Sequence, residues 1–399
     1  MKNKVKIISI IVAIFAVLAG AIAYRYRHEI IDMLKVVNCK TGKSETNDFE
    51  SFFHCNLSPR SVVIFEPNPY HHECIPGYAK YFTDLGYSVD ILLIKDNEDS
   101  MCLFEPDEKL RIFLYDSLEQ ISNDKKVCEK LKNRFNKYDF VFVNTTDPGK
   151  KDIYSALGLL QNKNSLFVAH DINFVKYDMN MEEFFNENRV ISLGNFASSG
   201  SVYVNPHYFG KVIEKNKNKK TRFFITSTKG KKYDYLIDAV KQLNKEKLDF
   251  EIVVVGRNQT LSEKTVPAEI KNKFIFKGSV SYKEMYKQVN ESDYIIVIFD
   301  PENPEDEPFK NLRVTGSSQL SYGFLKPSIM HSEFAGNYSM TNENSILYNN
   351  KTLEEALRKA IKSSDSEYKE MQENLLKLKE NIYKLSLENL KKAMKYSLW

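Results

Sequence analysis

The chain is poor in the residues on which small cross-linked or metal-stapled proteins rely. Its 399 residues include 15 glycines, 12 prolines, one tryptophan and 5 cysteines. No cysteine pair has C-x-x-C spacing and no histidines stand at zinc-finger spacing, which excludes the common structural zinc sites. The cysteines are expected to be buried free thiols, with a Cys39–Cys55 or Cys74–Cys102 bridge left open for an oxidising compartment.

An excess of one charge is also missing. Lys plus Arg number 57 and Asp plus Glu number 53, giving a formal net charge of +4, and the two signs are interleaved along most of the chain. This balance argues against nucleic acid as a partner. With 42% hydrophobic residues, a chain of this length is expected to form two globular domains with their own cores.

Only the amino terminus has a long hydrophobic run. Residues 7–24 (IISIIVAIFAVLAGAIAY) are uncharged and would rise about 27 Å as a helix, close to the thickness of a bilayer core. We predict a membrane anchor over residues 1–28, and a cleaved signal peptide ending near residues 21–23 is the alternative. Basic residues on both flanks leave the orientation open. The polar residues 29–59 are predicted to form a stem.

From residue 60 the pattern alternates between apolar strands and amphipathic helices. Apolar strands separated by helices predict a parallel sheet covered on both faces. The alternation occurs twice, over residues 60–210 and 221–365, on either side of a lysine-rich linker at residues 211–220. The sequence therefore predicts two α/β domains followed by C-terminal surface helices over residues 366–399.

Ligands of such sheets bind beyond the carboxyl ends of the strands, so the loops there hold the candidate sites. In RVTGSSQLSYGFLKP, Gly316, Ser317 and Ser318 open a short helix whose unpaired N–H groups would face an anion such as phosphate. The alternative is an ordinary capped helix that ends at a glycine and a proline. The preceding DPENPEDEP stretch is predicted to be a solvated acidic loop rather than a metal site.

A second candidate loop, STKGKK, follows the strand that ends near Ser227. Lys229, Gly230 and two further lysines lead into a helix, and lysine at a helix start opposes the helix dipole unless an anion is bound there. Arg257, after the strand IVVVG, would face the same place. A solvated basic turn is the alternative.

The first half offers two polar clusters at strand ends. His71, His72 and Glu73 follow the first strand, where they would meet a ligand or orient its hydroxyl groups, although exposed or structural histidines are equally expected. Two adjacent histidines make no metal site without further ligands. His170 and Asp171 follow SLFVA and are predicted as a catalytic pair because an imidazole and a carboxylate stand together at a strand end.

With these motifs in view, the chain resembles GT-B fold glycosyltransferases, and its second half is similar to those of the family four type. The resemblance covers residues 60–399. It rests on the order and spacing of HHECIPGYAKYFTDLGYSVDIL, STKGKKYDYLIDAVKQL, FEIVVVG, FKGSVSYKEMYKQVNESDYIIV and GSSQLSYGFLKPSI.

The resemblance implies two Rossmann-like domains that face a cleft, with a nucleotide diphosphate sugar held by the second. Lys229 would bind phosphate, Gly316 to Gln319 would contact the diphosphate and ribose, and His170 would lie near the transferred sugar. The first domain, including His71 to Gly77, would take the acceptor, with no metal and no cofactor other than the sugar donor. The family has two glutamates eight positions apart, whose places fall near Lys310 and Ser318 here. Neither of these residues is acidic, and Gln319 is the nearest polar substitute.

Three functions are compatible with these features. The leading one is a membrane-bound glycosyltransferase that moves a sugar from a nucleotide donor to a glycan, lipid-linked or protein acceptor. An exported two-lobed solute-binding protein and a donor-binding relative without turnover are the alternatives.

The role of Lys229 is open to a direct test. Lys229→Ala should weaken donor binding or turnover at least about tenfold, because a positive group that stabilises a departing diphosphate is lost. Steady-state kinetics on purified protein measure the effect. Full activity in this variant would show that the loop was assigned wrongly.

Overall fold

The computed structural model describes residues 46–95, 104, 107–207, 212, 216–227, 231–256, 261–349 and 352–396. The predicted anchor and most of the stem lie outside these residues, as do Cys39, Cys102, Lys229, Gly230 and Arg257. No helix in the described part is long and apolar enough to cross a membrane. Cys55, Cys74 and Cys128 are free thiols.

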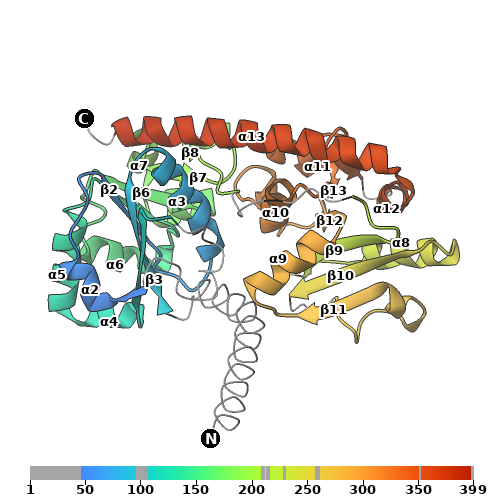
Figure 1. The fold of residues 1–399 in the computed structure, drawn as a ribbon, viewed down its shortest axis with the longest axis horizontal. Helices are drawn as coiled ribbons and strands as arrows, with labels where there is room; N and C mark the ends of the chain where they lie inside the picture. The colour runs from blue at the N-terminus through green and yellow to red at the C-terminus, as the bar shows by residue number, and fades with distance from the viewer. Residues whose placement is uncertain are drawn as a thin grey trace, which may run out of the picture.

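The first domain is built on an eight-stranded, fully parallel sheet of order β1-β4-β3-β2-β5-β6-β7-β8 (Figure 1). Its strands are β1 (Thr46–Asp48), β2 (Ser61–Phe65), β3 (Ser88–Ile94), β4 (Leu110–Tyr115), β5 (Phe140–Val143), β6 (Ser165–Ala169), β7 (Val190–Ser192) and β8 (Val202–Tyr203). Its α-helices are α2 (Phe49–His54), α3 (Ile75–Asp84), α4 (Leu118–Asn123), α5 (Lys125–Phe135), α6 (Lys151–Ala156) and α7 (Glu182–Asn186). Short turns are 3-10 helices η1 (His72–Cys74), η3 (Pro148–Lys150) and η5 (Ala197–Ser199), and η4 (Phe174–Asp178) is a π-helix.

The second domain repeats the design with a six-stranded parallel sheet of order β11-β10-β9-β12-β13-β14. Its strands are β9 (Thr221–Ser227), β10 (Phe250–Gly256), β11 (Phe274–Gly278), β12 (Tyr294–Val297), β13 (Ser328–His331) and β14 (Ser345–Tyr348). Its helices are α8 (Asp234–Lys245), α9 (Tyr282–Glu291), α10 (Gly316–Phe324), α11 (Ser332–Ala335), α12 (Leu353–Lys362) and the 3-10 turns η6 (Ala268–Lys273), η7 (Glu307–Lys310) and η8 (Gly336–Tyr338). The prediction of two parallel α/β domains is confirmed.

Each sheet is buried on both faces, which explains why its strands are uniformly apolar. In β2, Val63 and Phe65 point into one hydrophobic cluster while Val62 and Ile64 point into another. The second sheet is also sandwiched between two clusters. Because successive side chains alternate between faces, a continuous apolar run is needed to fill both layers.

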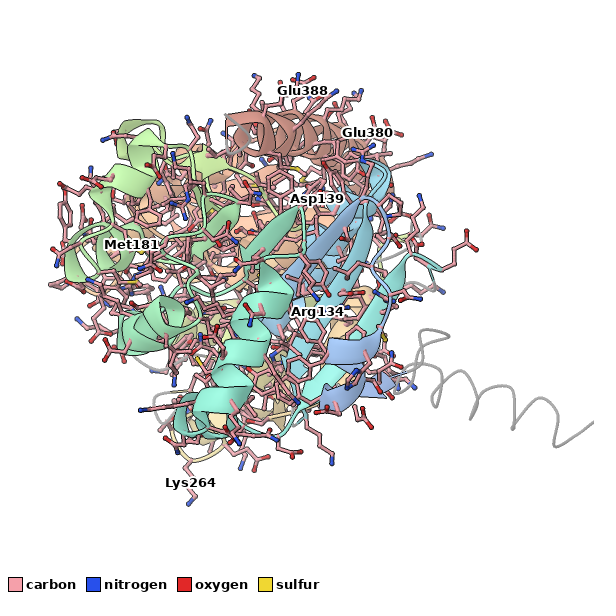
Figure 2. The ribbon with its side chains drawn as sticks, turned by 90° about the vertical axis from the view of Figure 1, so that its left-hand side faces the viewer. Arg134, Asp139, Met181, Lys264, Glu380 and Glu388 are labelled. Carbon is pink, nitrogen blue, oxygen red and sulfur yellow. The ribbon has the colours of Figure 1, made fainter. Side chains whose placement is uncertain are left out.

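The last helix, α13 (Asp365–Tyr396), joins the two domains. Its 32 residues would extend roughly 48 Å, and Figure 1 shows it running along both domains. Leu375 packs in the second domain, and Leu390 packs in the first. Glu380 and Glu388 point away from the protein body (Figure 2). The helix is at the surface as predicted, but its buried face also fixes the two sheets relative to each other.

The prediction of a stem up to residue 59 is wrong for its last part. β1 pairs in parallel with β4 at the sheet edge, and Phe52 of α2 is fully buried. Arg134 of α5 donates to the Cys55 carbonyl at 2.7 Å and lies over the Phe52 ring. The stretch TNDFES is polar in composition, yet it forms a short edge strand and the start of a helix with one aromatic face.

The structural role of α2 can be tested by truncating its buried ring. Phe52→Ala should destabilise the protein by about 3–5 kcal/mol, because a buried phenyl group is replaced by a cavity. Phe53→Ala, at a half-buried position of the same helix, is the matched control and should lower the free energy of unfolding by less. Urea unfolding of both variants makes the comparison, and equal stabilities would contradict this placement of α2.

Candidate active site

Three adjoining cavities lie where the carboxyl ends of the two sheets meet. Their volumes are about 520, 480 and 280 Å³. The 520 Å³ cavity lies mainly in the second domain, whereas the other two are lined by both domains. Val314 lines all three, so the cavities form one cleft at the place where parallel sheets bind ligands.

The N-terminus of α10 opens onto the cleft. Thr315 is the N-cap, and its side chain accepts a hydrogen bond from the Ser317 amide at 3.4 Å. A Cβ atom built on Gly316 would meet no protein atom within 4 Å, so open space lies directly in front of this backbone. The positive end of a helix dipole that borders open space suits an anion.

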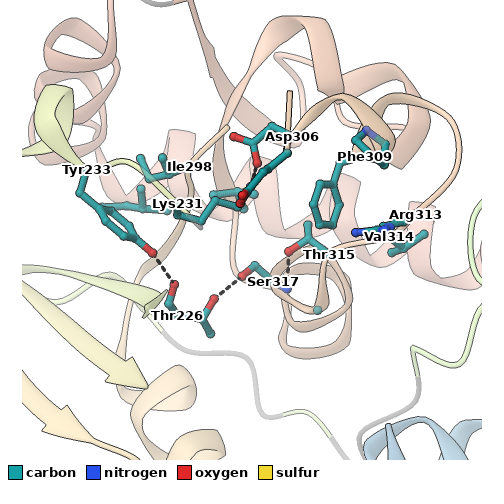
Figure 3. A pocket seen from close by; sticks show the side chains of 15 residues that line it. Thr226, Lys231, Tyr233, Ile298, Asp306, Phe309, Arg313, Val314, Thr315 and Ser317 are labelled. Atoms are coloured by element: carbon teal, nitrogen blue, oxygen red, sulfur yellow. Dashed lines mark hydrogen bonds and ion pairs between the residues drawn. The ribbon is translucent and has the colours of Figure 1, made fainter. Parts of the chain in front are cut away.

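Hydrogen bonds connect this helix to the end of β9 (Figure 3). The Thr226 and Ser317 hydroxyl groups share a hydrogen bond of 2.8 Å, and the Tyr233 hydroxyl donates to the Thr226 carbonyl at 3.4 Å. Thr226 and Tyr233, which flank the predicted phosphate loop, are therefore connected to the predicted helix start.

Lys231 makes a structural contact on the other wall of the 520 Å³ cavity. It pairs with the buried Asp306 (Figure 3). Its ammonium group also lies 4.1 Å from the ring centroid of Phe299. Burial lowers the pKa of Lys231, and the hydrogen bond to Asp306 opposes this. Asp306 also accepts from the Asp300 amide at 2.9 Å, and both of these residues are buried. Glu302, Glu305 and Glu307 are exposed, so the prediction of a solvated acidic loop is wrong only for Asp300 and Asp306.

The predicted donor residues differ in their access to the cleft. Gly316 and Ser317 line it, whereas the buried Ser318 donates its hydroxyl to the Thr315 carbonyl at 2.7 Å and acts as a structural contact. Gln319 lines the 280 Å³ cavity, is 5% exposed, and both polar atoms of its amide lack a partner among the described residues. Ser227 is also buried at the end of β9.

The turn after β2 forms the facing wall. His71 has a left-handed backbone (φ 65°), and its ring stacks on His170 with centroids 3.8 Å apart. Glu73 accepts a hydrogen bond from Tyr282 of the second domain at 3.0 Å. Burial would raise the pKa of Glu73, but the hydrogen bond with His71 and the nearby histidine charges lower it to about 2. An ionised carboxylate thus links the domains.

His170 is held as a neutral imidazole. Its Nε2 lies 3.0 Å from the Asn144 carbonyl, and because a carbonyl only accepts, Nε2 carries the proton. Burial, followed by the charge of His71, lowers the pKa of His170 well below its usual value. Nδ1 is therefore the ring nitrogen with a free lone pair, as a proton acceptor requires.

Asp171, predicted as the catalytic partner of His170, joins the domains instead. One carboxylate oxygen accepts from the amides of Asn173 and Phe174, and the other pairs with Arg313. The Ile172 amide also donates to the Leu312 carbonyl at 3.2 Å beside this ion pair. Both oxygens are engaged, so Asp171 is a positioning residue in this arrangement.

Two residues predicted on the acceptor side have packing roles. A Cβ on Gly77 would lie 2.8 Å from the Pro206 backbone, so glycine lets α3 approach that segment. His72 is 7% exposed, and its ring packs edge-on against Tyr282 with centroids 5.0 Å apart.

Glu66 is a site residue that the sequence analysis missed. It follows β2, is fully buried, and accepts hydrogen bonds from the Asn144 amide (2.5 Å), the Thr145 hydroxyl (2.7 Å) and the Asn68 backbone (2.8 Å). Asn144 also donates to the His71 carbonyl at 2.9 Å. The position of Glu66 directly after an apolar strand was the one sequence feature that could have identified it as a site residue.

Comparison with known proteins agrees with this architecture. Residues 209–303 match the family model of glycosyl transferases group 1. The structure is similar to TarM (TM-score 0.57, 11% identity, 84% of this chain and 99% of TarM). It is also similar to a glycosyltransferase from Rickettsia africae ESF-5, with a TM-score of 0.54 and 14% identity. That alignment covers 86% of this chain and 99% of the Rickettsia protein. The chain has the GT-B fold.

A third GT-B match is HepE from Anabaena, whose crystal structure is a complex with UDP and glucose. It is 13% identical, with a TM-score of 0.52, and the alignment covers 84% of this chain and 99% of HepE. No curated protein matches the sequence. Within the described ranges, no group of three or more histidine, cysteine or acidic side chains is arranged to hold a metal ion.

The buried carboxyl of Glu66 predicts a specific pH dependence. Burial raises its pKa from 4.5 to about 8, against the hydrogen bonds it accepts. The folded protein therefore keeps a proton that the unfolded chain releases, so the stabilising contribution of Glu66 is full below about pH 4.5 and is lost as the pH rises through about 8.

Glu66→Gln removes this titration but keeps the shape of the side chain. The stability advantage of the wild-type protein over the variant should shrink between about pH 5 and about pH 9, measured by urea unfolding at each pH. Other titrating groups cancel in the difference. Parallel stability curves would refute the raised pKa.

Proposed function

We propose that this protein transfers a sugar from a nucleotide diphosphate sugar to an acceptor in the cleft. The observation that carries the proposal is the juxtaposition of the α10 N-terminus with the neutral His170 across the 280 Å³ cavity, which both line. The group 1 match over residues 209–303 and the GT-B fold support it.

Within this function, we place the chain with the family four type and the donor in the second domain. The diphosphate would lie against the backbone of Gly316 and Ser317, where the positive end of the helix dipole would attract its negative charge. Lys229 and Arg257 are proposed to add positive charge, since both follow strands that end at this edge of the sheet. With these groups the proposed reaction uses neither a metal ion nor a cofactor beyond the donor.

The transfer needs little covalent chemistry from the protein. The bond between the anomeric carbon of the sugar and the diphosphate oxygen breaks, and a bond from that carbon to an acceptor hydroxyl oxygen forms. The electron pair leaves with the diphosphate, where helix amides stabilise it. The hydroxyl proton passes to the free Nδ1 of His170, which its hydrogen bond to Asn144 has oriented.

The proposed setting is a membrane. The uncharged run at residues 7–24 would anchor the protein, and the acceptor would be a glycan, a lipid-linked saccharide or a protein.

Gly316 provides the test of donor binding. Gly316→Ala should fold normally, because its new Cβ meets no protein atom within 4 Å, but it should weaken nucleotide binding at least about tenfold by holding the diphosphate away from the helix amides. The readout is the thermal shift with UDP, GDP, CMP and dTDP and their sugars. Gly336→Ala, also in open space but outside the three cavities, is the matched control.

Other outcomes identify the alternatives. Stabilisation by free sugars alone would indicate a solute-binding protein. Donor binding without product from a labelled donor would indicate an inactive relative. If nucleotides shift the melting temperature of both glycine variants equally, the donor does not bind at α10.

A further inference from the structure

The exposed aromatic side chains gather at one cavity. Within the part of the chain that the structure describes, four large hydrophobic side chains are exposed: Tyr70 (44%), Phe174 (45%), Tyr177 (56%) and Leu385 (41%). Tyr70 and Phe174 line the 480 Å³ cavity, and Tyr177 lies in η4, whose first and last residues line it. Single exposed apolar residues are ordinary, but three around one cavity indicate a binding surface.

The two lining rings are held in place although they are exposed. The Tyr70 hydroxyl donates to Asp147 at 2.7 Å, and its ring packs edge-on against His71 with centroids 5.1 Å apart. The Arg313 guanidinium lies 5.2 Å from the ring centroid of Phe174. Rings that are fixed before binding lose little conformational entropy when a ligand arrives.

Polar groups in the same cavity are arranged for hydroxyl groups. Thr146 is 6% exposed and lines the cavity, and its hydroxyl has no partner among the described residues, as a site awaiting a ligand would show. The exposed Asp178 also lines this cavity and offers acceptor oxygens. Aromatic faces combined with a few hydrogen-bonding groups are typical of small-ligand pockets.

The charge of the lining disfavours an anionic ligand. Among the described lining residues, the acidic side chains are Asp147, Asp171 and Asp178, and the basic ones are His71, His170 and Arg313, which is already paired with Asp171. His170 is neutral because burial and the charge of His71 lower its pKa. Acidic polymers and anionic lipid surfaces would meet like charge here.

We infer that the 480 Å³ cavity is an acceptor site for a neutral saccharide, whose apolar ring faces pack on Tyr70 and Phe174 while its hydroxyl groups bond to Thr146 and Asp178. This inference rests on the proposed function. It narrows the proposed acceptor from a glycan, a lipid-linked saccharide or a protein to an uncharged saccharide. Sugars combine apolar C–H faces with polar edges, which matches this mixture of rings and acceptors.

The location of the 480 Å³ cavity suits transfer of a sugar to a bound saccharide. His71 and His170 line both the 480 Å³ cavity and the 280 Å³ cavity that borders α10. A saccharide in the first cavity would therefore present a hydroxyl group beside the histidine pair, next to a donor held at α10.

Direct glycan binding tests the inference without requiring turnover. Wild-type protein is applied to an array of neutral oligosaccharides, phosphorylated or uronic-acid oligosaccharides, and phosphatidylglycerol–phosphatidylcholine vesicles. We expect retention on a subset of neutral oligosaccharides. Tyr70→Ala and Phe174→Ala should each weaken it at least about tenfold, as is common for an aromatic anchor.

Two controls separate ring stacking from damage to the fold. Leu385→Ala removes the exposed side chain on α13 and should bind glycans as the wild type does. Tyr70→Phe keeps the ring but loses the hydrogen bond to Asp147, and should retain more binding than Tyr70→Ala. Binding confined to anionic oligosaccharides or vesicles, or unchanged glycan binding in both alanine variants, would overturn the inference.

Donor binding keeps this test distinct from that of the proposed function. In Tyr70→Ala and Phe174→Ala, the thermal shift with the nucleotide donor should equal that of the wild type. Neutral glycan binding without any nucleotide shift would contradict the transferase and leave the saccharide site standing. A nucleotide shift with no neutral glycan bound would contradict the saccharide site and leave the transferase standing.

Discussion

The hydrogen bond between the Glu66 carboxyl and the Asn144 amide is the contact on which the cleft depends. Both groups are fully buried at the ends of adjacent strands, and Asn144 connects them to the His71 turn and to the His170 ring. A charged carboxylate here would carry a large desolvation cost, which the pKa of about 8 avoids at neutral pH. The first domain thus presents its histidine pair from a neutral, hydrogen-bonded support.

Charge is instead concentrated where the domains meet. Glu73 bonds to Tyr282, and Asp171 pairs with Arg313, so each contact takes one partner from each domain. Together with α13, which packs in both cores, these contacts hold the carboxyl ends of the sheets face to face. The arrangement explains why Asp171, next to His170 in sequence, has a different role: its carboxylate is already engaged across the cleft.

The sequence predicted the features that depend on local patterns and missed those that depend on distant partners. Uniformly apolar strands identified both parallel sheets, because burial on two faces leaves a direct trace in composition. Asp306 is buried against Lys231, 75 residues away, so the composition of its acidic and proline-rich segment did not reveal that this one carboxylate is paired. The packing role of Gly77 likewise requires Pro206, which no spacing rule places beside it.

This chain differs from family four glycosyltransferases, which it resembles, at the two positions where those enzymes carry glutamates. Lys310, near one expected glutamate, pairs with Glu307 and Glu333. Ser318, near the other, donates its hydroxyl to the Thr315 carbonyl within the helix. Gln319 is then the polar group that α10 presents to the 280 Å³ cavity. A carboxylate there would accept hydrogen bonds from ligand hydroxyl groups but repel a nearby diphosphate, whereas an amide both donates and accepts without a charge. At this position, recognition of ligand hydroxyl groups would then rest on a neutral side chain.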